Sequence, residues 1–244
     1  MIEIVGRSHT GQVRENNEDR IGFDTDLAIA VLADGMGGLN AGEVASKVAV
    51  ETIVKSLKTC ERIDEDAVEL AIDQANAEVL EQSASRGETG GMGTTVVVWT
   101  LTPQGQCFIG HVGDSRAYRL RNHTLKALTS DHSVVQQMLD EGVLSEGEAR
   151  VAPNRNIITR AVGLESSVEV DVRSWVHGEG DLFLLCSDGL TDMLSDDEIY
   201  KLLLPHIDES GAGDLEAVAD ALVSAANSAG GHDNVSVLLI RAVQ

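Results

Sequence analysis

The sequence predicts an α+β fold in which sheets and helices form separate layers. Helix-like patterns gather in residues 41–85 and 195–228, whereas short β-branched or aliphatic segments gather in residues 92–128. Because helices and strands do not alternate along the chain, a doubly wound parallel sheet is disfavoured. The chain has 244 residues and no linker-like or low-complexity stretch, so we expect one domain over residues 1–244.

Three segments have the apolar spacing of amphipathic helices. They are residues 41–58, 65–84 and 215–226. In the second of them, Val68 and Ile72 lie one helical turn apart and face the same side. We interpret all three apolar faces as parts of the core, without a functional role.

The predicted strands are short and mostly aliphatic. Turn residues at 102–105 and 121–124 join neighbouring strands into two hairpins. Residues 133–165 are polar and irregular, and we expect them to form a small surface flap with short helical stretches. The strands are expected at Ile2–Val5, Leu27–Ala33, Thr94–Leu101, Gln106–Val112, Arg116–Leu120, Leu125–Leu128, Leu182–Cys186 and Val235–Ile240.

The charge balance argues against polyanionic partners. Eighteen Lys and Arg against 40 Asp and Glu leave a net charge of −22, and no basic stripe is visible in the sequence. Nucleic acids and anionic membranes are therefore disfavoured as partners. A phosphate substrate would need a local reversal of this field, which bound divalent cations can provide.

The cysteines and the chain start favour the cytoplasm. Cys60, Cys107 and Cys186 are far apart and odd in number, which suggests neither a zinc site nor a disulfide framework. Cys186 lies in an apolar run and is expected to be a buried free thiol. The N-terminus lacks a signal-peptide pattern, and the longest apolar runs, about seven residues, are too short to cross a membrane.

The candidate site consists of aspartates at the ends of apolar strands. Asp34 directly follows a predicted strand, Asp114 and Asp188 each follow another after one residue, and Asp233 precedes the last one. A carboxylate beside a buried strand is costly unless it is paired or holds a metal. Oxygen-only ligands select hard cations such as Mg²⁺ or Mn²⁺. The alternative is that each aspartate merely begins a turn, and the sequence does not show that the four converge.

Two further features have both a functional and a plain structural interpretation. The glycines at 35, 37 and 38 would let the backbone approach a ligand closely, or would simply form a tight turn. Arg14 lies among several acids, so it could be salt-bridged or could clamp phosphoryl oxygens with its guanidinium.

In a series of short motifs, which include these aspartates, glycines and Arg14, the chain resembles the PP2C (PPM) protein phosphatases, in particular their compact bacterial members. Each motif alone is weak, but together, in this order, they are highly specific and span almost the whole chain. The motifs are Ser8-x-x-Gly11-x-x-Arg14-x-x-Asn17-Glu18-Asp19, Ala33-Asp34-Gly35-Met36-Gly37-Gly38, Gly93-Thr94-Thr95, Val112-Gly113-Asp114-Ser115-Arg116, Thr129-x-Asp131-His132-Ser133, Thr159-Arg160-Ala161-Val162-Gly163, Cys186-Ser187-Asp188-Gly189-Leu190 and Asp233-Asn234.

The resemblance implies a four-layer α/β/β/α sandwich, in which helices flank two antiparallel sheets and residues 133–165 form the flap. It also implies a centre of two, or in bacterial relatives three, Mn²⁺ or Mg²⁺ ions. Asp34 would bridge two ions, the Gly35 carbonyl would bind one, and Asp188 and Asp233 would hold the other. The further roles that the resemblance implies are a third ion on Asp114 with Asp188, phosphate binding by Arg14, and support of the ions and their waters by Glu18, Asp19 and Asn234.

The implied reaction is hydrolysis of phosphoserine or phosphothreonine by a metal-activated water, without a phosphoenzyme. Some relatives carry a histidine, proposed as a general acid, at the positions of Met36 or Leu39. Neither histidine is present here, so the sequence does not identify the residue that protonates the leaving oxygen. We interpret His111, His132 and His232, which lie near the motifs, as structural or exposed.

The expected partners are phosphorylated proteins, including a bacterial Ser/Thr kinase and its substrates, and the chain is expected to be a monomer. Two alternatives remain. One is a catalytically inert binding module, which would be marked by loss of a metal-binding aspartate, although Asp34, Asp114, Asp188 and Asp233 are all present. The other is a phosphatase acting on a small phosphate ester.

Overall fold

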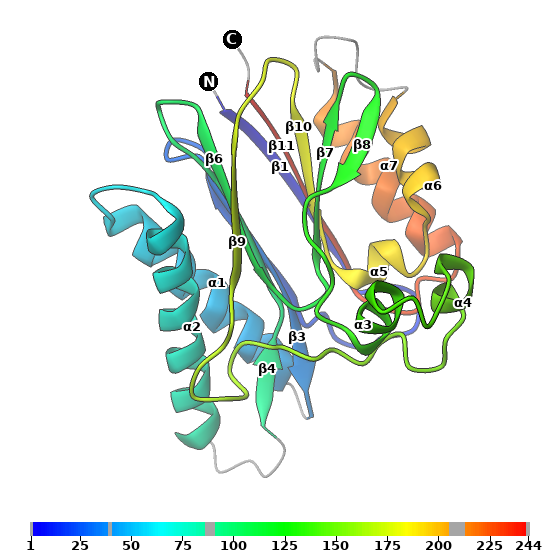
Figure 1. The fold of residues 1–244 in the computed structure, drawn as a ribbon, viewed down its shortest axis with the longest axis horizontal. Helices are drawn as coiled ribbons and strands as arrows, with labels where there is room; N and C mark the ends of the chain where they lie inside the picture. Colours follow the sequence, from blue (N-terminus) through cyan, green and yellow to red (C-terminus); the bar gives the residue numbers. More distant parts are fainter. Residues whose placement is uncertain (1, 39–40, 86–90, 205–212, 243–244) are drawn as a thin grey trace.

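In the computed structural model, two antiparallel sheets stack face to face, with helices on both outer surfaces (Figure 1). The structure describes residues 2–38, 41–85, 91–204 and 213–242. This arrangement confirms the predicted four-layer α+β sandwich. None of the described helices is long and apolar enough to span a bilayer.

The first sheet has the strand order β1-β11-β10-β7-β8, with every neighbouring pair antiparallel. It joins the two ends of the chain, because β1 pairs with β11 along its whole length. The predicted second hairpin is confirmed, and its turn places Asn122 and His123 at positive φ. The strands are β1 Ile2–His9, β7 Arg116–Arg121, β8 Thr124–Ala127, β10 Leu182–Cys186 and β11 Val235–Ala242.

The second sheet has the order β2-β3-β5-β6-β9, and β4 pairs with the far end of β3. The predicted first hairpin is confirmed by the antiparallel pairing of β5 with β6. The strands are β2 Asp19–Asp24, β3 Ile29–Gly37, β4 Met92–Thr94, β5 Val96–Leu101, β6 Gln106–Val112 and β9 Asp171–Val176.

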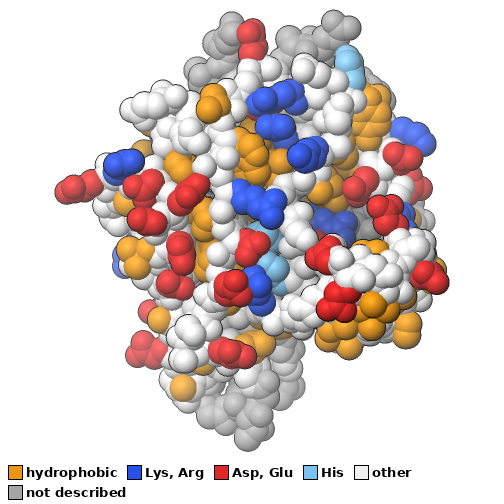
Figure 2. All heavy atoms as spheres, viewed as in Figure 1, with side chains coloured by type: hydrophobic (Ala, Val, Ile, Leu, Met, Phe, Trp, Pro, Cys, Tyr) orange, Lys and Arg blue, Asp and Glu red, His pale blue; other side chains and the backbone are white. Residues whose placement is uncertain are grey.

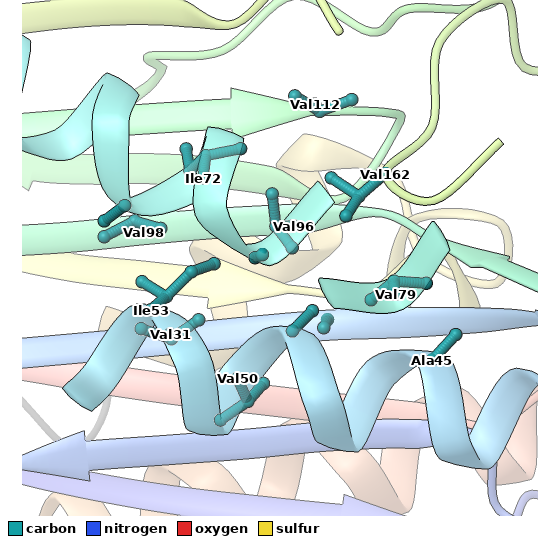
Figure 3. Packing of buried hydrophobic residues seen from close by; sticks show 14 of the residues in the cluster. Val31, Ala45, Val50, Ile53, Ile72, Val79, Val96, Val98, Val112 and Val162 are labelled. Atoms are coloured by element: carbon teal, nitrogen blue, oxygen red, sulfur yellow. The ribbon is translucent and has the colours of Figure 1, made fainter. Parts of the chain in front are cut away.

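The helices cover the outer face of each sheet with aliphatic side chains. In Figure 3, Ile53 of α1 and Ile72 of α2 pack toward Val31 and Val98 of the second sheet. Burying one such side chain fully is worth about 1.5–3 kcal/mol. The helices are α1 Ala41–Thr59 and α2 Glu65–Ser85 on the second sheet, and α5 Asp188–Thr191, α6 Asp196–Leu203 and α7 Leu215–Ser228 on the first.

A third apolar layer fills the space between the sheets. Trp99 and Phe183 meet there with ring centroids 5.5 Å apart, surrounded by aliphatic residues such as Leu32 and Leu238. Cys186 is a buried free thiol, as expected, and Cys107 is also free and buried, whereas Cys60 is free and exposed.

Residues 133–165 contain two short helices, α3 Val134–Asp140 and α4 Glu146–Arg150, as expected. Ser133 and Ser145 cap them by accepting hydrogen bonds from backbone N–H groups. Both helices share a small apolar cluster of their own that includes Val135 and Ala149.

β2 and β9 were not predicted, and the strands expected at Ile2–Val5, Leu27–Ala33 and Val235–Ile240 extend further than predicted. β2 begins with Asp19 and Arg20 and ends with Asp24, and β9 carries Asp171 and Arg173, so both strands lack the aliphatic run that marked the other strands. The strand expected at Leu27–Ala33 continues through Asp34 to Gly37. It does so because β3 exchanges its partner β5 for β4 beyond Leu32.

Candidate metal centre

The site begins with two aspartates on neighbouring strands. In the β2–β3 ladder, Asp19 lies directly opposite Asp34. The backbone of Asp34 is held from the other side, because its N–H donates to Thr95 Oγ1 at 3.1 Å and its carbonyl accepts from Thr95 N at 2.8 Å. Asp34 is therefore fixed where β3 changes partners.

Three more aspartates come from the loops at the same edge of the sandwich. Asp188 begins α5 directly after β10, Asp114 lies in the β6–β7 connection, and Asp233 lies just before β11. Asp34 is close enough to Asp19, Asp188, Asp114 and Asp233 for their charges to raise its pKa. We call these five residues the acidic cluster. The structure thus brings together all four aspartates singled out in the sequence, together with Asp19.

The electrostatics of the acidic cluster oppose full ionisation. Burial, then the charges of Asp19 and Asp188, raise the pKa of Asp34 well above its usual value. Burial and the charges of Asp114 and Asp192 do the same for Asp188. Burial raises the pKa of Asp19 to about 6, and burial together with Asp131 raises that of Asp114 to about 6. Carboxylates this close repel one another and need a positive partner at neutral pH.

Two carboxylate oxygens of the acidic cluster have no hydrogen-bond partner among the described residues. Oδ1 of Asp19 and Oδ1 of Asp188 are buried and accept no hydrogen bond. The second oxygen of Asp19 accepts a hydrogen bond from Ser187 Oγ at 2.8 Å. Buried anionic oxygens without donors, in a site built only from oxygen ligands, fit hard divalent cations. The residues present therefore suit the Mn²⁺ or Mg²⁺ ions expected from the sequence.

Close backbone packing explains two of the motif glycines. A Cβ on Gly35 would lie 2.1 Å from the carbonyl oxygen of Gly42, and one on Gly189 would lie 1.9 Å from that of Asn234. Both distances are far inside van der Waals contact, so these positions accept only glycine. The close approach brings the start of α1 onto β3 and the start of α5 onto β11.

Asn234 ties the N-terminal loop to the acidic cluster. Its side-chain Oδ1 accepts from Glu18 N at 2.8 Å, and its Nδ2 donates to the carbonyls of Thr10 and Asn16, each at 2.9 Å. Asn234 itself is buried. It therefore holds the segment carrying Arg14 and Glu18 beside Asp233.

Arg14 is half-exposed and lies at the rim of the acidic cluster. Its guanidinium donates to Asp233 Oδ2 at 2.6 Å. The pKa of nearby Glu18 is raised by burial, against the opposing charge of Arg14. A guanidinium has further N–H donors besides the one used here, so the salt bridge and a phosphate contact are compatible.

The structure adds residues that were not singled out as site candidates. Asp192 lies one helical turn after Asp188, and its charge raises the pKa of that residue. Asp131 acts on Asp114 while its carboxylate is bound by both Nε and Nη2 of Arg116, each at 2.7 Å. The spacing of four residues in Asp188–Asp192 was a visible signal, whereas the reach of Asp131 depends on the fold.

A second group of potential metal ligands lies near the base of the flap. In the described part of the chain, the one trio with all ligand atoms within 4.8 Å is His111, His132 and Asp171. Arg160 already bonds Asp171 at 3.1 Å and lies 3.2 Å from His132 Nε2. His111 Nε2 faces the Ser130 carbonyl at 2.9 Å. A guanidinium at the trio disfavours a cation there and favours the structural interpretation of both histidines.

The remaining histidine positions add no general acid. His232 is exposed, as expected. Met36 lies in β3, and Leu39 falls outside the described residues. Position 36, which is a histidine in some relatives, therefore offers no general acid here.

Comparisons with known proteins agree with this geometry. A family model described as protein phosphatase 2C matches residues 5–224. The serine/threonine phosphatase stp of Listeria monocytogenes is 40% identical over 243 residues, covering 96% of this chain and 93% of that protein. The crystal structure of the Mycobacterium tuberculosis serine/threonine phosphatase PstP/Ppp superposes with a TM-score of 0.90 at 33% identity, covering 100% and 99% of the two chains. A PstP catalytic domain in complex with two manganese ions gives a TM-score of 0.86 at 32% identity, covering 100% and 99%.

Proposed function

This chain belongs to the protein phosphatase 2C family, and we propose on that premise that it hydrolyses phosphoserine and phosphothreonine in proteins with the help of divalent cations. The observation that carries the proposal is the acidic cluster. Its buried carboxylates, two of them with unpartnered oxygens, have no evident purpose without cations.

The ligands would be the carboxylates of Asp34, Asp188 and Asp233, together with the Gly35 carbonyl. Asp114 would add a further position beside Asp188, so the centre would hold two or three Mn²⁺ or Mg²⁺ ions. Such ions, when bound, lower the pKa of a water molecule and offset the charge of the phosphoryl group.

Arg14 would bind the phosphate of the substrate. Its salt bridge to Asp233 orients the guanidinium toward the acidic cluster, and its half-exposed position leaves it accessible from solvent. Glu18 and Asp19 would support the ions and their waters, and Ser187 Oγ donates a hydrogen bond to one oxygen of Asp19. With Met36 in place of the histidine of some relatives, protonation of the leaving oxygen does not use a side chain at that position.

The substrates are phosphoproteins, and we place among them a bacterial Ser/Thr kinase and its targets. Three free thiols suit a reducing cytoplasm, because disulfides are rare there. Residues 1–244 would act as a single phosphatase domain and a monomer, with residues 133–165 as the flap beside the centre. The salt bridge of Arg155 to Asp192 at 3.7 Å supports that place for the flap.

Hydrolysis of a phosphothreonine peptide tests the proposal. We expect activity with Mn²⁺, none with EDTA, and none in Asp188→Ala, while the matched exposed change Asp73→Ala keeps wild-type activity. Full activity in EDTA would exclude the metal mechanism. Peptide binding without turnover would favour the inert module, and a strong preference for small esters over peptides would favour that alternative.

A further inference from the structure

A cationic groove lies at the open margin of the sandwich, between the edge strands β8 and β9. It has a volume of about 380 Å³ and is lined by Lys126 of β8, by Leu128 just after that strand, and by Arg173 and Trp175 of β9, among others. β8 ends the first sheet and β9 ends the second. The groove is therefore the place where the two sheets part and open to solvent.

Three cations point into this margin instead of the apolar residues found deeper between the sheets. Arg119 and Lys126 are directly paired across the β7–β8 ladder, so their side chains lie on one face. That face is the inner one, because Ala117, two residues before Arg119, belongs to the layer between the sheets. Arg173 shares its face of β9 with Trp175, which packs against the same layer.

These cations have no ion pair among the described residues. Arg116 and Arg121, on the same strand as Arg119, are bound by Asp131 and Asp181. Arg119, Lys126 and Arg173 make no such contact in residues 2–38, 41–85, 91–204 and 213–242. In a chain with a net charge of −22, a group of unpaired cations is unexpected. Figure 2 shows Lys and Arg side chains gathered along the middle of this face, with Asp and Glu on either side.

Arg119, the innermost of the three cations, has a buried N–H group, at Nε, that donates no hydrogen bond within the part of the chain that the structure describes. Its charge also acts on the buried Cys107 thiol, which places it near the floor of the margin. The one acidic residue lining the groove, Glu65, accepts a hydrogen bond from Ser174 Oγ at 2.6 Å. Cations left without partners at a solvent-filled margin are suited to a ligand that carries negative charge.

The strands that border the groove favour an extended peptide. Each edge strand has one side without a strand partner in its sheet, and such an edge can pair with an added strand. Charged residues on edge strands can also serve only to prevent edge-to-edge aggregation. The buried, unpartnered Nε of Arg119 is not explained by that role, because an anti-aggregation charge acts from the exposed surface.

We propose that this groove binds an extended acidic segment of the enzyme's substrate proteins, with carboxylates held by Lys126 and Arg173, which line the groove, and by Arg119, which is paired with Lys126 across the β7–β8 ladder. The proposal rests on the proposed function only in naming substrate proteins as the source of the segment. A long nucleic acid fits less well, because acidic residues border the groove on this face.

The groove is connected to the acidic cluster through a short chain of contacts. Arg173 lies close enough to His111 for the two charges to interact. The ring of His111 stacks on that of His132 with centroids 4.5 Å apart, and His132 Nδ1 accepts from Gly113 N at 3.2 Å. Gly113 directly precedes Asp114. A segment bound in the groove would therefore lead toward the loop that carries Asp114.

Binding is measured by fluorescence anisotropy of a labelled, unphosphorylated peptide in which glutamates alternate with valines, using manganese-loaded full-length protein. The matched peptide has glutamine for glutamate. We expect only the glutamate peptide to bind, and more weakly as NaCl is raised. Lys126→Glu and Arg173→Glu should each weaken binding by roughly threefold to fivefold, and the double variant by roughly tenfold or more. The exposed control Lys55→Glu on α1 should change it by less than about twofold.

A second arm measures kcat/KM for a phosphothreonine peptide with an acidic flank relative to one with a neutral flank. The wild type should favour the acidic flank, and both groove variants should lower that ratio. Wild-type affinity in the double variant, equal binding of the glutamine peptide, or equally tight binding of single-stranded DNA would each overturn the proposal. Hydrolysis of neither peptide, with glutamate-peptide binding intact, would refute the proposed phosphatase function and leave the groove standing.

Discussion

Replacing Asp188 with asparagine should stabilise the metal-free protein and abolish its response to metal. Asparagine keeps the shape of the side chain but removes one buried charge from the acidic cluster. In EDTA, that charge destabilises the folded state, because the carboxylate of Asp188 repels those of Asp34 and Asp114. The same charge would attract cations when they are supplied. One substitution therefore has opposite expected effects in the two conditions.

The size of the effect follows from the raised pKa values. Asp19 and Asp114 have pKa values of about 6 instead of 3.8. Each unit corresponds to about 1.4 kcal/mol, so each residue costs the folded state about 3 kcal/mol once it is fully ionised. Because the pKa in the folded state lies above that in the unfolded state, the folded protein does not bear this cost at low pH. Its free energy of unfolding falls as pH rises through about 6. Asp188 has a pKa raised from the same causes, so its removal should recover about 1–3 kcal/mol at about pH 8.

Urea unfolding followed by circular dichroism measures this directly. In EDTA at about pH 8 the variant should be more stable than the wild type, and at about pH 5 the difference should shrink toward zero. With Mn²⁺ at about 100 times its Kd, the wild type should gain about 2.7 kcal/mol and the variant much less. Asp73→Asn, the same change at an exposed position of α2, should shift stability by no more than about 0.5 kcal/mol.

Two results would refute this reasoning. One is a variant that is less stable than the wild type in EDTA at about pH 8, which would mean that Asp188 is a structural anchor. The other is a Mn²⁺ response equal to that of the wild type, which would remove Asp188 from the centre.

Three further outcomes are expected. Arg14→Ala should raise KM for a phosphopeptide by roughly tenfold, through loss of a charge-assisted phosphate contact, while the Mn²⁺ concentration for half-maximal activity changes little; a large shift in that concentration would mean that Arg14 supports the metals instead. Gly189→Ala should destabilise the protein by more than about 2 kcal/mol in urea unfolding, because its Cβ would lie 1.9 Å from the Asn234 carbonyl, and a neutral result would show that α5 can move off β11. Ile53→Ala should cost about 2–5 kcal/mol in the same assay, since Ile53 is fully buried between α1 and the second sheet, and a loss below about 1 kcal/mol would indicate a collapsible core.

Local pattern was sufficient for most of the fold. The strand expected at Gln106–Val112 has those bounds in β6, and the helix expected at residues 41–58 is α1 Ala41–Thr59. These elements bury an aliphatic face, so their periodicity is visible in the sequence. β9 was not predicted because its inward positions carry two charged residues, Asp171 and Arg173, before the aromatic Trp175. Its identity as a strand depends on pairing with β6, about 60 residues away in the chain.

The sequence by itself determined which residues are candidates for the chemistry, because the aspartates and glycines of the motifs have few other reasons to follow apolar strands. Only the tertiary structure decided that they converge, since Asp19 and Asp34 meet through strand pairing while Asp114, Asp188 and Asp233 arrive from loops of both sheets. The same holds for the cationic groove. The composition predicted no basic stripe, yet β7, β8 and β9 bring Arg119, Lys126 and Arg173 to one margin. Distances between residues remote in the chain are set by sheet register and layer packing, which no local pattern encodes.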